Sequence, residues 1–239
     1  MSKFELNLFA NDEDLARSAA GEWIEEIPVR LSSAAPYCVA LSGGRITRRF
    51  FSCLTDIART RSTALNSVHF FWGDERCVPP SDGESNFAMA HELLFMPMGI
   101  GDAQIHRIHG EEVPEVAAAQ AEAELRHIAW QDSNGQPVLD LIFLGMGEDG
   151  HVASLFPGES DETMASKAVY RAVTATKPPP RRITLGYAAI AAARQVWVLA
   201  SGPGKEEALR ESLAAAGQTP LGRVLKFRAH TRIFTDLQV

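Results

Sequence analysis

Short apolar runs alternate with longer amphipathic stretches along most of the chain. Runs rich in β-branched and aromatic residues predict strands, and stretches with helical periodicity predict the helices between them. The expected strands are 4–9, 37–41, 68–72, 139–144, 169–173, 195–200 and, at the edge of the sheet, 233–234. The expected helices are 12–31, 45–59, 86–95, 114–131, 187–193 and 205–216.

Strands that are separated by helices of this length indicate right-handed crossovers and an α/β fold. We therefore expect a mainly parallel central sheet with helices on both faces. At 239 residues the chain is long enough to bury one sizeable core. Because no repeat or low-complexity linker interrupts the pattern, we expect a single domain over 1–239, with Pro178-Pro179-Pro180 as a rigid loop inside it.

Composition narrows the class of protein. The chain has 46% hydrophobic and 22% charged residues, which is ordinary for a globular protein. Its formal net charge of −7 argues against nucleic-acid binding but allows a local basic pocket. It has no apolar run long enough to span a membrane and no signal-peptide pattern at the N-terminus. Three cysteines without a C-x-x-C pair favour the reducing cytoplasm.

Four polar, glycine-rich segments follow expected strands. In parallel sheets, ligands bind outside the carboxyl ends of the strands, so these segments predict one common site. They are Ser42-Gly43-Gly44, Gly73-Asp74-Glu75-Arg76, Gly145 to His151, and Ser201 to Lys205.

The first of these segments resembles an anion-binding turn. Gly43 and Gly44 let backbone amides approach an anion, and the following helix adds free N–H groups. Arg45 in the first helical turn opposes the helix dipole unless an anion lies nearby. The alternative is a tight turn that is followed by a solvated arginine face.

Other basic side chains lie where they can hold a phosphate. Arg76 follows a strand together with Asp74, Arg182 follows the triple proline on a stiff loop, and Lys205 begins a helix. A guanidinium can bind phosphate through two hydrogen bonds, and a lysine can act as a point charge. Each of these residues has an alternative role as a structural or solvent-facing side chain.

The segment Gly145 to Gly150 matches the G-x-G-x-x-G pattern of dinucleotide sites. Pro157-Gly158 ends any helix that begins at His151, so the sustained helix of such a site is excluded. His151 is instead the candidate general base, with Asp149 two residues before it to orient the imidazole. A capping histidine is the alternative. Amides of Gly43-Gly44 or of Gly147 to Gly150 are candidate donors to an oxyanion.

The remaining histidines give no metal site. His106 and His109 have the spacing of a weak metal pair but lack a third ligand, and the glycines just before them favour a loop. The other histidines, His69 among them, are scattered without a partner pattern. No G-x-S-x-G nucleophile elbow is present.

Taken together, these motifs resemble the 6-phosphogluconolactonase family over nearly the whole chain. The matching segments, in order, are Leu41 to Gly44, Gly73 to Pro79, Ser85-Asn86, Gly145 to Gly158, Pro178 to Leu185, and Gly204-Lys205.

The resemblance implies a three-layer, Rossmann-like fold that glucosamine-6-phosphate deaminases and sugar-phosphate isomerases share. It implies hydrolysis of 6-phosphoglucono-δ-lactone to 6-phosphogluconate in the oxidative pentose phosphate pathway, with no metal or organic cofactor. By position, His151 corresponds to the catalytic base, and Arg76, Arg182 and Lys205 to residues around the phosphate. The partner it implies is a small sugar-phosphate lactone, with no nucleic acid or membrane, and the sequence leaves monomer and homodimer open.

The chain departs from the family pattern at one segment, and two alternative functions must be weighed against the resemblance. The family commonly continues its double glycine with Ser-Thr-Pro, where this chain has Arg45-Ile46-Thr47. A deaminase or isomerase needs another carboxylate base, but the segment Ser154 to Pro157 contains no acid. A non-catalytic sugar-phosphate sensor is disfavoured because the chain has no spare DNA-binding segment and keeps His151.

Overall fold

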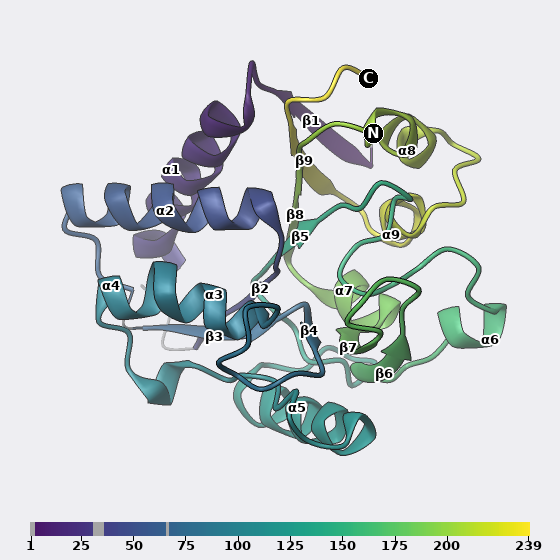
Figure 1. The fold of residues 1–239 in the computed structure, drawn as a ribbon, viewed down its shortest axis with the longest axis horizontal. Helices are drawn as coiled ribbons and strands as arrows, with labels where there is room; N and C mark the ends of the chain where they lie inside the picture. The colour runs from purple at the N-terminus through teal and green to yellow at the C-terminus, as the bar shows by residue number, and fades with distance from the viewer. Residues whose placement is uncertain (1–2, 31–35, 66) are drawn as a thin grey trace.

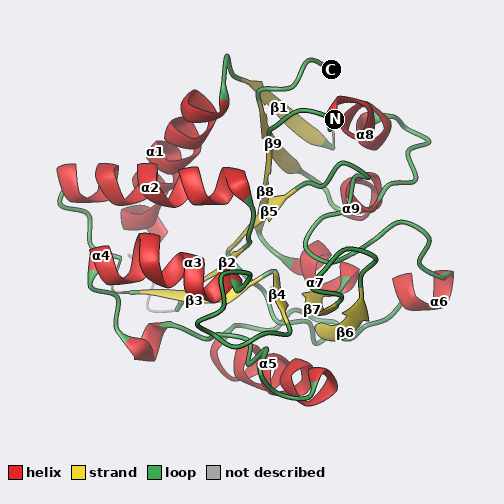
Figure 2. Ribbon diagram, in the orientation of Figure 1, coloured by secondary structure: helices red, strands yellow, loops and turns green. Residues whose placement is uncertain are grey.

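The computed structural model describes residues 3–30, 36–65 and 67–239 (Figure 1). Its centre is a sheet of six parallel strands in the order β1-β9-β8-β5-β2-β3, shown in yellow in Figure 2. The parallel pairing confirms the expected sheet. The strands are β1 (Phe4–Leu8), β2 (Tyr37–Leu41), β3 (Val68–Trp72), β5 (Leu141–Gly145), β8 (Gln195–Ala200) and β9 (Thr231–Thr235).

Helices cover both faces of this sheet, as Figure 1 shows. The helices α1 (Asp12–Arg30) and α2 (Arg45–Thr60) lie on one face, and α7 (Tyr187–Ala192), α8 (Glu206–Leu213) and α9 (Pro220–Phe227) lie on the other. Trp23 of α1, Phe50 of α2 and Phe143 of β5 are buried against one another, with centroids of Trp23 and Phe143 5.1 Å apart. Burial of such large rings stabilises the helix–sheet contact. The expected end of the first helix at Leu31 lies outside the described residues.

A second, antiparallel sheet was not expected from the sequence. It has the order β4-β7-β6, and α5 (Pro114–Ile128) packs against it. Its strands are β4 (Asp74–Arg76), β6 (Tyr170–Thr174) and β7 (Arg181–Leu185). The prediction that Arg182 lies on a loop is therefore wrong: the triple proline forms the turn, and Arg181 and Arg182 already pair with Thr174 and Val173.

Three further elements differ from the expectation. The stretch 86–95 is α3 (Asn86–Ala90) followed by a π-helical turn (His91–Phe95) and α4 (Met96–Met98). Helix α9 was not expected, although Thr219 caps it by accepting from the amide of Gly222 at 3.0 Å. Strand β9 lies between β1 and β8, not at the sheet edge, because the N-terminal strand pairs outside it. Two short turns complete the list: Asp102–Gln104, which is 3-10 helical, and α6 (Asp161–Met164).

Candidate active site

A cavity of about 120 Å³ lies at the carboxyl edge of the central sheet, where β2, β5 and β8 end. Each of the four polar segments that the sequence placed at this edge contributes to its wall. The lining residues are Ser42, Gly43, Gly44, Arg45, Ile46, Asp74, Arg76, Asn86, Gly145, Met146, His151, Ala153, Arg182 and Lys205. The structure thus brings together every candidate site residue except Asp149 and Gly147, which contact His151 from outside the cavity wall.

The turn from β2 into α2 presents its backbone to the cavity. Gly44, the N-cap of α2, has a φ of 102°, which glycine adopts without strain. A Cβ on Gly43 would lie 1.8 Å from Oδ1 of Asn86, so a larger residue would force these segments apart. The first amides of α2 have no partners within the helix, and together with the helix dipole they favour an anion.

The departure from the family pattern changes which groups reach the cavity from α2. The hydroxyl of Thr47 donates to the carbonyl of Gly43 at 2.9 Å, and Thr47 does not line the cavity. Arg45 and Ile46 do line it. A guanidinium therefore stands at the position where the family commonly places a hydroxyl.

Four cations surround the cavity, and the pKa is lowered for two of them, Arg182 and Lys205. Arg76 and Arg182 are register partners across β4 and β7, and burial together with the charge of Arg76 lowers the pKa of Arg182. Burial together with the charge of Arg45 likewise lowers the pKa of Lys205. Like charges that are held together and partly desolvated disfavour their charged forms. A bound phosphate reverses this cost, so the arrangement favours an anionic ligand.

His151 and Asp149 form a closely bonded pair beside these cations. Nδ1 of His151 lies 2.5 Å from Oδ1 of Asp149, and the imidazole side chain is 22% exposed. Burial acts to raise the pKa of Asp149, but the charge of His151 and its hydrogen bonds outweigh this, and the pKa is lowered. With its Nδ1 bound to a carboxylate, the ring keeps Nε2 for a ligand.

Glycine at position 147 makes room for this imidazole. A Cβ on Gly147 would lie 2.0 Å from Cε1 of His151. The Gly147 amide also donates to the His151 carbonyl at 2.9 Å, which closes the loop beneath the ring. The sequence pattern at 145–150 therefore serves the packing of a histidine, and not the approach of a dinucleotide.

We expect Gly147→Ala to lower kcat/KM on the order of ten-fold. The new methyl group displaces the imidazole and breaks its bond to Asp149, and small misplacements of a catalytic group are costly. Steady-state kinetics measure the effect. Gly21→Ala in α1 is the matched control, because beyond its chain neighbours and the backbone of its own helix no described atom lies within 4 Å of the new methyl group. Equal rates for Gly147→Ala and Gly21→Ala would contradict this account of the loop.

Two histidines outside the cavity, His69 and His106, form a pair that the sequence did not reveal. Nε2 of His106 lies 2.9 Å from Nδ1 of His69, and Nδ1 of His106 lies 3.0 Å from Glu124. The expectation that His69 has no partner is therefore wrong. The pair joins a histidine of β3 to one 37 residues later in the chain, and only the folded structure brings these two positions together. His109 contacts only the nearby Glu111 among the acids described. No three described metal-ligating side chains are arranged to hold an ion.

This histidine pair predicts that stability falls in mild acid. Burial lowers the pKa of both His69 and His106 below the ordinary value of 6.5. As the pH drops below 6.5, the unfolded chain takes up protons that the folded protein does not, so the free energy of unfolding decreases. Urea unfolding at pH 7.5, 6.5 and 5.5 measures this slope. It becomes shallower in His69→Gln, and an unchanged slope in that variant would contradict the assignment.

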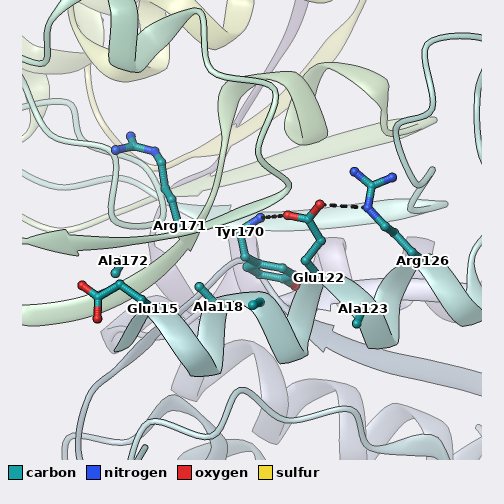
Figure 3. Close-up of a pocket in the computed structure, with 9 residues that line it drawn as sticks. Glu115, Ala118, Glu122, Ala123, Arg126, Tyr170, Arg171 and Ala172 are labelled. Carbon is teal, nitrogen blue, oxygen red and sulfur yellow. Dashed lines mark hydrogen bonds and ion pairs between the residues drawn. The ribbon is translucent and has the colours of Figure 1, made fainter. Parts of the chain in front are cut away.

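A separate hollow lies between α5 and β6, and its polar groups bind one another. Figure 3 shows Glu122 of α5 between Arg126 and the start of β6. Its carboxylate accepts from Nε of Arg126 at 2.8 Å and from the amide of Val169 at 3.0 Å. The bond to Val169 satisfies a backbone amide just before the edge strand β6, which gives Glu122 a structural role.

A parallel α/β sheet whose carboxyl edge holds a histidine–carboxylate pair among four cations defines a class: enzymes that act on small anionic substrates. Comparison with known proteins narrows this class. A model of the family described as glucosamine-6-phosphate isomerases/6-phosphogluconolactonase matches residues 10–233. The chain belongs to this family.

Individual relatives agree with the family match. The 6-phosphogluconolactonase of Streptomyces coelicolor is 31% identical over 220 residues, which cover 90% of this chain and 84% of that protein. The 6-phosphogluconolactonase of Treponema pallidum is 35% identical over 196 residues, covering 81% and 79%. The solved 6-phosphogluconolactonase of Trypanosoma brucei superposes with a TM-score of 0.83 at 28% identity, covering 98% and 97%.

Proposed function

We propose that this protein hydrolyses 6-phosphoglucono-δ-lactone to 6-phosphogluconate, a step of the oxidative pentose phosphate pathway. The observation that carries the proposal is the pairing of His151 with Asp149 at the wall of a cavity that four cations surround. A phosphorylated lactone needs both parts: positive charge for its phosphate and a base for the water that attacks its carbonyl. Relatives that match 90% and 81% of this chain bear the name of this activity.

His151 acts as the general base in this proposal. Its Nε2 takes a proton from a water molecule as the water oxygen bonds to the lactone carbonyl carbon. The bond from that carbon to the ring oxygen then breaks, and the proton passes from Nε2 to the departing oxygen. Asp149 fixes the ring through Nδ1 and stabilises the imidazolium that forms between the two transfers.

Backbone amides of the Gly43-Gly44 turn are the best candidates to stabilise the oxyanion. Among the other candidates, the amides from Gly147 to Gly150, those of Gly147 and Gly150 already donate to the carbonyls of His151 and Gly147 at 2.9 and 3.1 Å. Gly43 and Gly44 line the cavity at the N-terminus of α2, where helical amides lack partners. Positioned donors of this kind lower the energy of the tetrahedral intermediate.

The cations hold the remote phosphate and thereby fix the position of the carbonyl. Arg76, Arg182 and Lys205 take this role, and Arg45 adds a fourth charge at the turn. Nε of Arg182 donates to the carbonyl of Pro179 at 3.0 Å, which fixes the side chain before a ligand arrives. Binding energy at the phosphate is used to orient the reacting atoms.

The deaminase or isomerase alternative is less well supported by the loop after His151. Leu155 is buried and Phe156 lies with its ring 5.0 Å from that of His151, so no carboxylate occupies this part of the site. Two substrates separate the alternatives. We expect purified protein to accelerate hydrolysis of 6-phosphoglucono-δ-lactone and to release no ammonia from glucosamine 6-phosphate. Ammonia release without lactone hydrolysis would establish the deaminase, and binding of both without turnover would establish the sensor.

The proposed function also implies which cofactors, compartment and partners the protein has. A δ-lactone is already electrophilic, so we expect hydrolysis without a metal or organic cofactor. We place the protein in the cytoplasm, because Cys38, Cys53 and Cys77 are all free thiols. Within the described part of the chain, no helix is both long and apolar enough to cross a membrane. The acidic net charge is consistent with a small-molecule partner and no nucleic acid.

A further inference from the structure

A buried serine connects the His151 loop to the carboxylate of the cavity. Ser154 is 0% exposed and lies three residues after His151. Its hydroxyl donates to Oδ2 of Asp74 at 2.6 Å, and its amide donates to the hydroxyl of Thr184 at 3.1 Å. Ser154 does not line the cavity, so it acts on a ligand only through Asp74.

The two bonds of Ser154 reach neighbouring positions in the small sheet. Asp74 of β4 and Thr184 of β7 are register partners. Ser154 therefore joins the loop that holds the base to the pair of strands from which Asp74 enters the cavity. Ala153, just before it, has a φ of 49°, a left-handed conformation that an alanine keeps only when its surroundings hold it. The two hydrogen bonds of Ser154 supply such surroundings.

Asp74 differs chemically from the rest of the cavity wall. It is the only carboxylate among the described residues that line the cavity, where the other charged groups are Arg45, Arg76, Arg182 and Lys205. Phosphate and an oxyanion need donors, but a sugar lactone also carries hydroxyl groups that need an acceptor. Asp74 is the charged acceptor in that wall, and it is 5% exposed.

The oxygens of Asp74 are unequally engaged. Ser154 holds Oδ2 in a short bond, whereas Oδ1 has a long contact of 3.5 Å with Nδ2 of Asn86. The stronger bond from Asn86 goes to the backbone carbonyl of Asp74, at 2.9 Å. Oδ1 therefore retains acceptor capacity, and the bond to Ser154 sets its direction.

We propose that Ser154 is a positioning residue that holds Asp74 to accept a ring hydroxyl of the lactone, which makes Asp74 a determinant of specificity for hydroxylated sugar lactones. This rests on the lactonase function proposed above. Without Ser154 the carboxylate can rotate about its last bond toward Arg182, whose pKa its negative charge acts to raise. The hydroxyl of the substrate then loses its acceptor, and Arg182 becomes less available to phosphate.

The test compares Ser154→Ala with wild type on a set of lactones. The set contains 6-phosphoglucono-δ-lactone and its 2-deoxy, 3-deoxy and 4-deoxy analogues. On the full lactone we expect Ser154→Ala to raise KM about ten-fold, the cost of one hydrogen bond to a charged group, and to leave kcat and its pH profile close to wild type. On the deoxy lactone that lacks the hydroxyl bound by Asp74, we expect the KM of wild type to rise to that of the variant. Ser154→Ala then raises KM no further.

Two further variants exclude a merely structural explanation. Thr55→Val is the matched control, because it removes a buried hydroxyl of α2 that donates to the Leu93 carbonyl away from the cavity. We expect its kinetics to match wild type. We expect Asp74→Asn to raise KM on the full lactone and to have no effect on the one deoxy lactone that lacks the bound hydroxyl. Adding Ser154→Ala to Asp74→Asn should not change these KM values further. Asp74→Asn also keeps the inference testable if Ser154→Ala does not fold.

The outcomes separate this inference from the function on which it rests. Failure of wild type to accelerate hydrolysis of any lactone overturns the proposed function. Active wild type with unchanged kinetics in Ser154→Ala overturns only the role of Ser154. If Ser154→Ala raises KM by the same factor on the full lactone and on every deoxy lactone, the role of Ser154 is also overturned. Such a result indicates a general disturbance of the site, which does not depend on which hydroxyl is present.

Discussion

Replacing His151 with alanine lowers kcat by roughly 10²–10⁴-fold, the usual contribution of a general base. The imidazole is the titratable side chain at the cavity wall that is oriented by a carboxylate, through the 2.5 Å bond to Asp149. KM changes little, because the phosphate-binding cations remain in place. Initial rates of lactone hydrolysis, corrected for the spontaneous reaction, measure both parameters.

Two variants serve as references for this result. His109→Ala removes a histidine that contacts Glu111 and does not line the cavity, and we expect it to match wild type. Asp149→Asn should lose less than His151→Ala, because the ring remains but is less firmly oriented. A His151→Ala enzyme that turns over at the rate of His109→Ala would remove His151 as the base.

Replacing Arg182 with methionine raises KM by roughly 10- to 100-fold and affects kcat less. Each hydrogen bond to a charged group contributes about 1.5–3 kcal/mol, and a factor of ten corresponds to about 1.4 kcal/mol. Methionine keeps much of the buried apolar volume, so the rise in KM comes mainly from the loss of the guanidinium group. Steady-state kinetics and inhibition by inorganic phosphate measure it.

The neighbouring arginine supplies the control. Arg181 begins the same strand, but it is exposed and does not line the cavity. We expect Arg181→Met to leave KM unchanged. Equal increases for the two variants would show a general effect of positive charge in place of a specific contact.

The centre of the large sheet was predictable because its inner strands, such as β2 and β5, are buried on both faces. The expected ranges 37–41, 68–72 and 195–200 coincide with β2, β3 and β8, which are apolar runs with clear ends. The small sheet was not predictable in the same way. β4 consists of three charged residues without an apolar pattern, and it exists as a strand because β7 pairs with it. Such pairing depends on contacts more than 100 residues apart, which local pattern does not contain.

The candidate site was predictable as a set of residues but not as a network. The rule that loops at the carboxyl edge converge brought His151, Arg76 and Lys205 into one cavity. The contacts of Ser154 with Asp74, and of Asn86 with Gly43, could not be foreseen. They join residues that are 80 and 43 positions apart, and the sequence showed Ser154 only as part of a segment without an acid.

The most direct test is the rate of 6-phosphogluconate formation from freshly generated 6-phosphoglucono-δ-lactone, followed through a coupled dehydrogenase. Wild type, His151→Ala and a reaction without enzyme are measured side by side. We expect wild type to accelerate hydrolysis well above the spontaneous rate and His151→Ala to lose most of this acceleration. A wild-type rate equal to the spontaneous rate would contradict the proposed function itself.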